Sequence, residues 1–349
     1  MGEEQTKQKH TLRNVFLIVL GIFVVSAAVF GIAFGTLLGN TTKNLVEIVP
    51  GPIRDIAEVI APPTPDPFVK ALATDVDYYE TGEIHQIPIY EQKKIDKFIF
   101  SFLIVVQNGK TDDEDHKSDM FFILSWNPLE QKCTIVAIPR DTLVSVEGYG
   151  WKRINAAYSL GGIGLLMNTI NESFGLDLQN YVYIGTDELA ELVEGLGGIP
   201  LRISSEEASY LSEQTGTDLK EGVRKLNGKQ IIALLLDRSS DNKGAIGRSR
   251  TQLRVIQNTY DYMVEEFDSS FVWPFFGLVS KGVRTNFDFE ILTSIGYEVV
   301  ESDELTLKLV VMPYEDSYTE MTFDGAYAIL PEFEKNRILL RQELFGIEE

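Results

Sequence analysis

An uncharged run of 24 residues at 15–38 (VFLIVLGIFVVSAAVFGIAFGTLL) constrains the topology of this chain more than any other feature. As a helix it would extend about 36 Å, enough to cross the ~30 Å hydrocarbon core of a bilayer. A signal peptide usually has only ~7–15 apolar residues, although the small residues in SAA and GIA keep cleavage as the alternative. Lys7, Lys9 and Arg13 precede the run, which favours a cytoplasmic N-terminus. We therefore predict a single-pass type II protein of the cell membrane, with residues 1–14 in the cytoplasm and the remainder outside.

The overall composition limits the partners and the metal chemistry of the chain. The formal net charge is −21 and the pI is near 4.6, so phosphate backbones are repelled at long range and no nucleic-acid partner is expected. The single cysteine, Cys133, excludes an internal disulfide, and the three scattered histidines argue against a histidine-based metal centre. Any phosphate ligand must therefore be bound by groups gathered locally.

Composition changes twice after the apolar run. Residues 39–96 are interpreted as an extracytoplasmic stalk, because APPTPDPF at 61–68 places four prolines in eight positions and favours an extended backbone. The acidic and aromatic end of this stretch is interpreted as a lead-in strand or an extended arm. From residue 97 to 349 the pattern becomes regular and predicts one domain of class α/β or α+β.

Strand and helix patterns alternate within this domain. The run FIFSFLIVV has the continuous apolar character of a strand buried on both faces, and the two runs that follow it are separated by a turn-like NPLEQK, which predicts an antiparallel hairpin. The strands are expected at 98–106, 120–126, 133–138 and 199–203, and the helices at 162–174, 186–196 and 228–237, with a long amphipathic helix from near Gly247.

Four arginines fall within one short window, LLLDRSSDNKGAIGRSRTQLR. Arg238 ends one apolar helix and Arg248 begins the next, so guanidinium groups and free backbone N–H groups can converge there on a phosphate. Arg248 and Gln252 share a helix face, whereas Arg250 and Arg254 are turned away by roughly 200°. The alternative, ordinary basic surface residues, is preferred for Arg250 and Arg254 from the spacing alone.

Charged side chains also follow the first apolar strands, where α/β sheets usually bind ligands. Arg140 and Asp141 follow the second hairpin strand in IPRD, and a turn with a surface ion pair remains the alternative there. Asp119, in KSD, is the first candidate ligand for a divalent cation, because Mg²⁺ is usually held by one or two carboxylates plus phosphate oxygens. The alternative for KSD is a solvated loop beside the acidic run TDDEDH.

The order of these motifs resembles the LytR-CpsA-Psr family over roughly residues 97–270. The residues that carry the resemblance are KSDM, IPRDT, RINAAYSLGG, LVEGLGGIPLRI, LNGKQIIALL and GRSRTQ, after an apolar strand with a polar end. The resemblance implies a single α/β domain with a central mixed β-sheet flanked by helices. It also implies a cell-envelope phosphotransferase that moves a glycopolymer from a polyprenyl-pyrophosphate carrier to peptidoglycan or another cell-surface acceptor, with the lipid in an apolar cleft.

Carried over by position, the resemblance assigns roles to single residues. Arg140, Arg238 and Arg248 match the family's phosphate-binding arginines and are expected to be catalytic. In an active transferase Asp141, beside Arg140, is expected to orient Arg140 or the acceptor hydroxyl. Gln252 matches a phosphate-binding glutamine.

The resemblance also implies a metal ion, and three further basic residues are candidates for binding the substrate. Mg²⁺ or Mn²⁺ is the implied cofactor, with Asp119 and Asn108 at the positions linked to it. Lys110, Lys117 and Arg250 are added as candidate substrate contacts.

Several positions depart from the family pattern. Asn108 and Ala245 stand where aspartates are usual, and Lys117 and Ser240 stand where arginines are usual. An amide lacks the negative charge that a hard cation favours, and a lysine lacks the planar fork of arginine. Two hypotheses follow: an active, metal-assisted transferase, or a membrane-tethered protein that binds the lipid without chemistry and serves envelope assembly or regulation.

Overall fold

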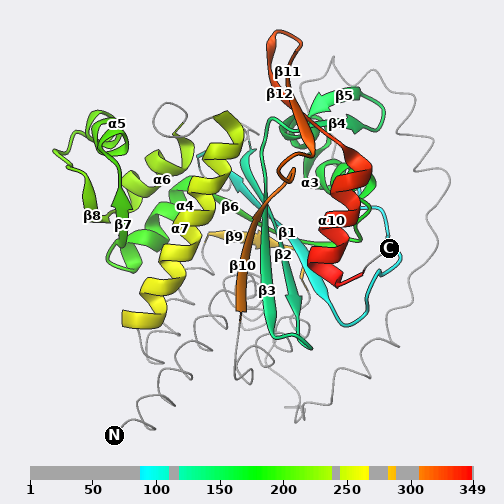
Figure 1. The fold of residues 1–349 in the computed structure, drawn as a ribbon, viewed down its shortest axis with the longest axis horizontal. Helices are drawn as coiled ribbons and strands as arrows, with labels where there is room; N and C mark the ends of the chain where they lie inside the picture. The colour runs from blue at the N-terminus through cyan, green and yellow to red at the C-terminus, as the bar shows by residue number, and fades with distance from the viewer. Residues whose placement is uncertain (1–86, 110–117, 238–243, 267–281, 288–305, 348–349) are drawn as a thin grey trace, which may run out of the picture.

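The fold is seen in a computed structural model (Figure 1), which describes residues 87–109, 118–237, 244–266, 282–287 and 306–347. The membrane span predicted at 15–38 and the stalk up to residue 86 lie outside these ranges. Among the described residues, no helix combines the length and the apolar character needed to cross a bilayer.

A six-stranded sheet forms the centre of the domain, in the order β10-β3-β2-β1-β6-β9. β1 pairs antiparallel with β2 and parallel with β6, β2 pairs antiparallel with β3, and β10 joins β3 in parallel. The sheet is therefore mixed, and the hairpin predicted at 120–126 and 133–138 is confirmed. The strands are β1 Phe100–Gln107, β2 Ser118–Asn127, β3 Lys132–Ile138, β6 Asn180–Gly185, β9 Val283–Thr285 and β10 Thr306–Val311.

Helices cover both faces of this sheet, which gives a three-layer α/β domain (Figure 1). One apolar core lies between the sheet and the helices α4, α5, α6 and α7. The other lies between the sheet and the helices α3 and α10. The helices are α3 Ile154–Phe174, α4 Thr186–Gly195, α5 Ser205–Thr215, α6 Gly228–Leu236, α7 Gly244–Glu266 and α10 Phe333–Phe345.

In the described part of the chain, three two-stranded sheets stand outside the central one. β11 and β12 form a hairpin that projects from the end of the domain, beside β4 and β5 (Figure 1). Its turn residues, Asp324 and Gly325, both have positive φ, at 49° and 73°, the backbone that a tight Asp-Gly hairpin turn requires. The pairs are β4 Leu143–Val146 with β5 Gly150–Arg153, β7 Ile199–Ile203 with β8 Gly222–Leu226, and β11 Tyr318–Phe323 with β12 Ala326–Pro331.

The helix α3 begins at Ile154, eight residues before the start predicted at 162. A break at Gly161 and Gly162, where the backbone is not helical, interrupts the apolar spacing and concealed the first part of the helix. An extended arm crosses this point: the N–H of Ile87 donates to the carbonyl of Gly161 at 3.0 Å. A Cβ on Gly164 would lie 1.7 Å from the oxygen of Ile87, so the close crossing requires glycine there.

Candidate functional site

Asp141 lies at the point where three arginines from separate parts of the chain meet. Its Oδ1 accepts a hydrogen bond from Nη1 of Arg153 at 3.2 Å and lies 3.8 Å from Nε of Arg140. Its Oδ2 lies 3.6 Å from Nη2 of Arg248. The turn after β3, the end of β5 and the first turns of α7 are thereby joined through one buried carboxylate.

Asp119 adds a second carboxylate to this group and forms an ion pair with Arg140. The pairing of Phe121 with Ile138 in β2 and β3, extended by two residues, places Asp119 directly opposite Arg140. Arg140 therefore lies between Asp119 and Asp141. The antiparallel hairpin that was predicted from the apolar runs is what brings KSD and IPRD together.

The resulting cluster, defined as Asp119, Arg140, Asp141, Arg153 and Arg248, contains three guanidinium groups and two carboxylates. Its formal charge is therefore positive, in a chain whose net charge is −21. Arg248 is only 4% exposed, so its charge is poorly screened by solvent. Guanidinium forks held in fixed positions are suited to phosphate oxygens.

The spacing of four residues between Arg248 and Gln252 places both on one side of α7, as the sequence predicts. Arg248 and Gln252 are both buried on one side of the helix, and Nε2 of Gln252 donates to the carbonyl of Leu235 at the end of α6 at 3.3 Å. Arg250 is exposed, and Arg254 is paired with Glu207 of α5. Arg250, which was added as a candidate substrate contact, is thus not brought to the cluster.

Arg153 was quoted within RINAAYSLGG but was given no role. Its position depends on the pairing of β4 with β5, in which Leu143 lies opposite Arg153, two residues beyond Asp141. The N–H groups of Ile154 and Asn155 donate to the carbonyls of Thr142 and Arg140, at 2.8 and 3.4 Å. The sequence signal that could have identified Arg153 is a basic residue that stands directly before a helix and shortly after IPRDT.

The β11–β12 hairpin is a second part of the site that the sequence did not assign. The N–H of Ile329 donates to the carbonyl of Asp141 at 3.0 Å, and Ile329 packs with Ala245 and Ile246 of α7. Burial raises the pKa of Tyr327, with further contributions from its hydrogen bond to Glu320 and from the charge of Asp141. The hairpin is therefore attached to the backbone of the cluster.

Asn108 and Asp119 mark the same end of the sheet, because the pairing of Gln107 with Ser118 brings the end of β1 to the start of β2. Asn108 is exposed. The buried hydroxyl of Ser118 and Nε of Arg140 have no hydrogen-bond partner within the described part of the chain, as expected of a site completed by a ligand.

No group of three or more His, Cys, Asp or Glu side chains with the arrangement of a metal site occurs among the described residues. At this edge the described part of the chain offers the carboxylate of Asp119 and the amide of Asn108. That set fits a magnesium ion only if phosphate oxygens and water supply the remaining ligands. The other predicted site residues, Lys110, Lys117 and Arg238, lie outside the described residues.

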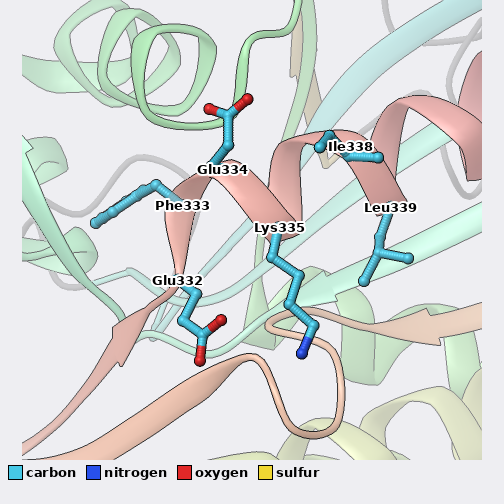
Figure 2. A pocket seen from close by; sticks show the side chains of 6 residues that line it. All are labelled: Glu332, Phe333, Glu334, Lys335, Ile338 and Leu339. Carbon is cyan, nitrogen blue, oxygen red and sulfur yellow. The ribbon is translucent and has the colours of Figure 1, made fainter. Parts of the chain in front are cut away.

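Hollows lined by described residues lie on the surface near this end of the domain. One, of about 440 Å³, lies between the start of α3 and the tip of the β11–β12 hairpin, and Arg153 is among its lining residues. Another, of about 510 Å³, runs along the first turns of α10 (Figure 2) and includes none of the cluster residues. The first hollow shares Arg153 with the charged cluster.

Comparison with known proteins agrees with this architecture. The chain is 25% identical over 259 residues to the regulatory protein MsrR of Staphylococcus aureus, covering 73% of this chain and 74% of that protein. It is 28% identical over 193 residues, 55% of this chain and 62% of the relative, to the polyisoprenyl-teichoic acid–peptidoglycan teichoic acid transferase TagU of Halalkalibacterium halodurans.

A solved structure has the same fold. It is that of the LytR-CPS2A-psr family protein YwtF (TagT) of Bacillus subtilis with bound octaprenyl pyrophosphate lipid, which superposes with a TM-score of 0.54 at 18% identity, over 73% of this chain and 94% of that one. At this identity the likeness establishes the fold alone. The sequence also matches the LytR_cpsA_psr family model over residues 73–338. From the mixed sheet, the motif order and this match, the chain belongs to the LytR_cpsA_psr family.

Proposed function

We propose that this chain is a membrane-anchored, extracytoplasmic phosphotransferase that moves a glycopolymer from a polyprenyl-pyrophosphate carrier to peptidoglycan or another cell-surface acceptor. The observation that carries the proposal is the convergence of Arg140, Arg153 and Arg248 on Asp141, with distances of 3.2 to 3.8 Å. Such a cluster can hold a pyrophosphate through several forks at once. Family membership and the likeness to the teichoic acid transferase TagU and to the lipid-bound TagT support the substrate class.

The chemistry of transfer requires positioning and charge neutralisation more than a reactive protein group. The acceptor hydroxyl attacks the phosphorus that carries the glycopolymer. A new phosphorus–oxygen bond forms, the bond from that phosphorus to the bridging oxygen breaks, and the polyprenyl phosphate departs with the electron pair. The hydroxyl proton ends on the departing phosphate.

The phosphate-binding arginines and Asp141 have distinct parts in this proposal. Arg140 and Arg248 bind the pyrophosphate oxygens, and Arg238, which precedes α7 in the sequence, adds a third fork. Asp141 holds Arg140 and Arg248 in position, because its two oxygens face different guanidinium groups. Preorganised donors of this kind act most strongly in a site with little water.

Asp119 and Asn108 would hold a Mg²⁺ or Mn²⁺ ion at the edge shared by β1 and β2. A bound divalent cation would supply further neutralisation of the pyrophosphate charge. Because Asp119 already pairs with Arg140, its carboxylate would serve both the arginine and the metal. Asn108 offers an oxygen without charge, so we expect weak metal affinity in the absence of the pyrophosphate.

One observation favours a second candidate function, lipid binding without chemistry in envelope assembly or regulation. Ala245 stands where the family usually has an aspartate, and it packs with Ile246 and Ile329 in a small apolar cluster. An apolar contact has replaced a carboxylate at the first turn of α7. MsrR, one of the relatives, is named a regulatory protein.

A turnover assay distinguishes the two candidates. The full chain in detergent is incubated with a polyprenyl-pyrophosphate-linked sugar, peptidoglycan fragments and Mg²⁺ or Mn²⁺, and release of polyprenyl phosphate is measured. The transferase requires metal-dependent release that is lost in Arg140→Ala and retained in Arg250→Ala, because Arg250 is exposed on the same helix as Arg248. Lipid retention without any release would instead establish the binding protein.

A further inference from the structure

The β11–β12 hairpin has two faces that look onto different parts of the site. Side chains alternate along a strand, and paired residues of two strands lie on the same face. Thr322 pairs with Tyr327, on the face that carries Ile329 and packs against the start of α7. Phe323 pairs with Ala326 on the opposite face.

That opposite face forms one wall of the hollow of about 440 Å³. The other wall consists of Lys152 and Arg153 at the end of β5 and of Asn155 and Ser159, which are four residues apart on α3. The volume lies within the ~300–1,000 Å³ range of small-molecule sites. The hairpin therefore divides the end of the domain into a side facing α7 and a side facing α3.

Arg153 links the two sides. It lines the hollow, and its Nη1 donates to Oδ1 of Asp141, the carboxylate that also faces Arg140 and Arg248. The N–H of Ile329 in the same hairpin donates to the backbone of Asp141. A molecule in the hollow would thus lie directly beside the proposed pyrophosphate site, with access to it past Arg153.

The lining of the hollow indicates the chemistry of its occupant. Phe323 offers an aromatic ring, Asn155 an amide, Ser159 a hydroxyl, Asp324 a carboxylate, and Lys152 and Arg153 offer cationic donors. An aromatic ring combined with neutral and charged hydrogen-bonding groups suits a sugar ring, which has an apolar face and a rim of hydroxyl or acetamido groups. A free pyrophosphate would be attracted by Lys152 and Arg153 but would lie against the like charge of Asp324 and leave the Phe323 ring unused, and a lipid chain would leave the polar groups without partners.

We propose that this hollow binds a sugar residue of the acceptor glycan, so that donor and acceptor approach the cluster from opposite sides of the β11–β12 hairpin. The inference rests on the proposed function, because the acceptor is defined by the transfer reaction. Phe323 and Asn155 are then residues that determine acceptor recognition, and neither belongs to the pyrophosphate contacts.

The test measures acceptor and donor binding separately, on the full chain in detergent. The acceptor probe is a soluble peptidoglycan tetrasaccharide of alternating N-acetylglucosamine and N-acetylmuramic acid, titrated by NMR without donor. We expect Phe323→Ala and Asn155→Ala each to weaken its binding about tenfold. Thr322→Ala is the matched control, since Thr322 is exposed on the other face of the hairpin. Ser159→Trp, which fills the hollow from an exposed position, should abolish binding without disturbing a buried residue.

Retention of a polyprenyl-pyrophosphate-linked sugar is measured on the same variants. We expect retention to be unchanged in Phe323→Ala and Ser159→Trp and to fall in Arg248→Ala. Acceptor binding that is unaffected in Phe323→Ala, Asn155→Ala and Ser159→Trp would overturn the inference, and so would a loss of donor retention in Phe323→Ala and Ser159→Trp, which would assign the hollow to the donor's own sugar. Failure of the proposed function is a separate result: the tetrasaccharide then binds in the hollow while no donor is retained.

Discussion

Arg248 Nη2 lies 3.6 Å from Oδ2 of Asp141, and this contact joins α7 to the turn after β3 across 107 positions of the chain. Both residues are largely buried, with 4% and 9% of their surfaces exposed. The same carboxylate faces Arg140 and Arg153 through its other oxygen. Its negative charge therefore offsets the mutual repulsion of three guanidinium groups and fixes where they point.

Replacement of Asp141 by Asn removes that charge at constant size. We expect the rate of transfer to fall about a hundredfold, because the arginines lose the orientation on which stabilisation of the reacting phosphate depends. Polyprenyl phosphate release under saturating donor provides the measurement. Glu207→Gln is the matched control, since it removes the carboxylate of another arginine ion pair, with Arg254, away from the cluster. An equal loss in both variants would show that Asp141 acts only through stability.

Arg248→Lys tests whether binding of the donor requires the planar guanidinium group at this position of α7 or only a positive charge. A lysine keeps the positive charge but cannot contact Asp141 and a phosphate through a planar fork. We expect donor affinity to fall about tenfold or more. Arg250→Lys, two residues further along the same helix and exposed, should leave affinity unchanged. Identical affinities for the two variants would rule out a specific role for Arg248.

Much of the central sheet could be predicted because its signals are local. The apolar runs of β1, β2 and β3 are continuous, and only a short turn separates β2 from β3, so the pairing of these two strands follows from the sequence. The capping residues Asn227 and Gln230 fix the start of α6 through reciprocal hydrogen bonds of 3.0 Å. The approach of Asp119 to Arg140 is a direct consequence of the β2–β3 register.

The remainder of the site depends on contacts between distant segments. Arg153 reaches Asp141 only because β4 and β5 fold back on each other. The β11–β12 hairpin has half-exposed strands with a weak apolar alternation, and only its Asp-Gly turn is a strong local signal. The attachment of Ile329 to the backbone of Asp141 joins residues that no spacing rule connects.

Asn336 is a buried side chain whose removal should destabilise the fold. Its Oδ1 accepts from the N–H of Tyr314 and from the hydroxyl of Ser317, and its Nδ2 donates to the carbonyls of Ser317 and Glu332. Asn336→Ala leaves several buried groups without partners, and we expect a loss of about 3 kcal/mol in the free energy of unfolding. The free energy of unfolding of this variant and of the unmodified chain is measured by urea denaturation.

The control for that experiment is Asn258→Ala, since Nδ2 of Asn258 donates a hydrogen bond to the carbonyl of Arg254 within α7. We expect a change of less than about 1 kcal/mol there. A comparable loss in the two variants would mean that the network around Asn336 contributes no more than one ordinary hydrogen bond. The network matters to function because it holds the segment between β10 and the hairpin.

Glu343 predicts a pH-dependent contribution to stability. Burial raises the pKa of this carboxyl, but the hydrogen bonds from Lys308 and Lys132, at 2.6 and 2.9 Å, outweigh burial and lower it below its ordinary value of 4.5. These ion pairs fasten α10 to β10 and β3. Because the folded chain has the lower pKa, their contribution is fully present above pH 4.5 and is lost as the pH falls through the lowered pKa.

Glu343→Gln should therefore destabilise the chain at pH 7, and the difference from the unmodified chain should shrink as the pH is lowered from about 5 towards 3. The free energy of unfolding in urea, measured across that range, checks the effect. Glu334→Gln is the control, because its carboxylate is 77% exposed and lies 3.9 Å from Arg337, so its effect should be small at every pH. A difference between Glu343→Gln and the unmodified chain that stays constant with pH would show that packing, and not the charge of Glu343, attaches α10 to the sheet.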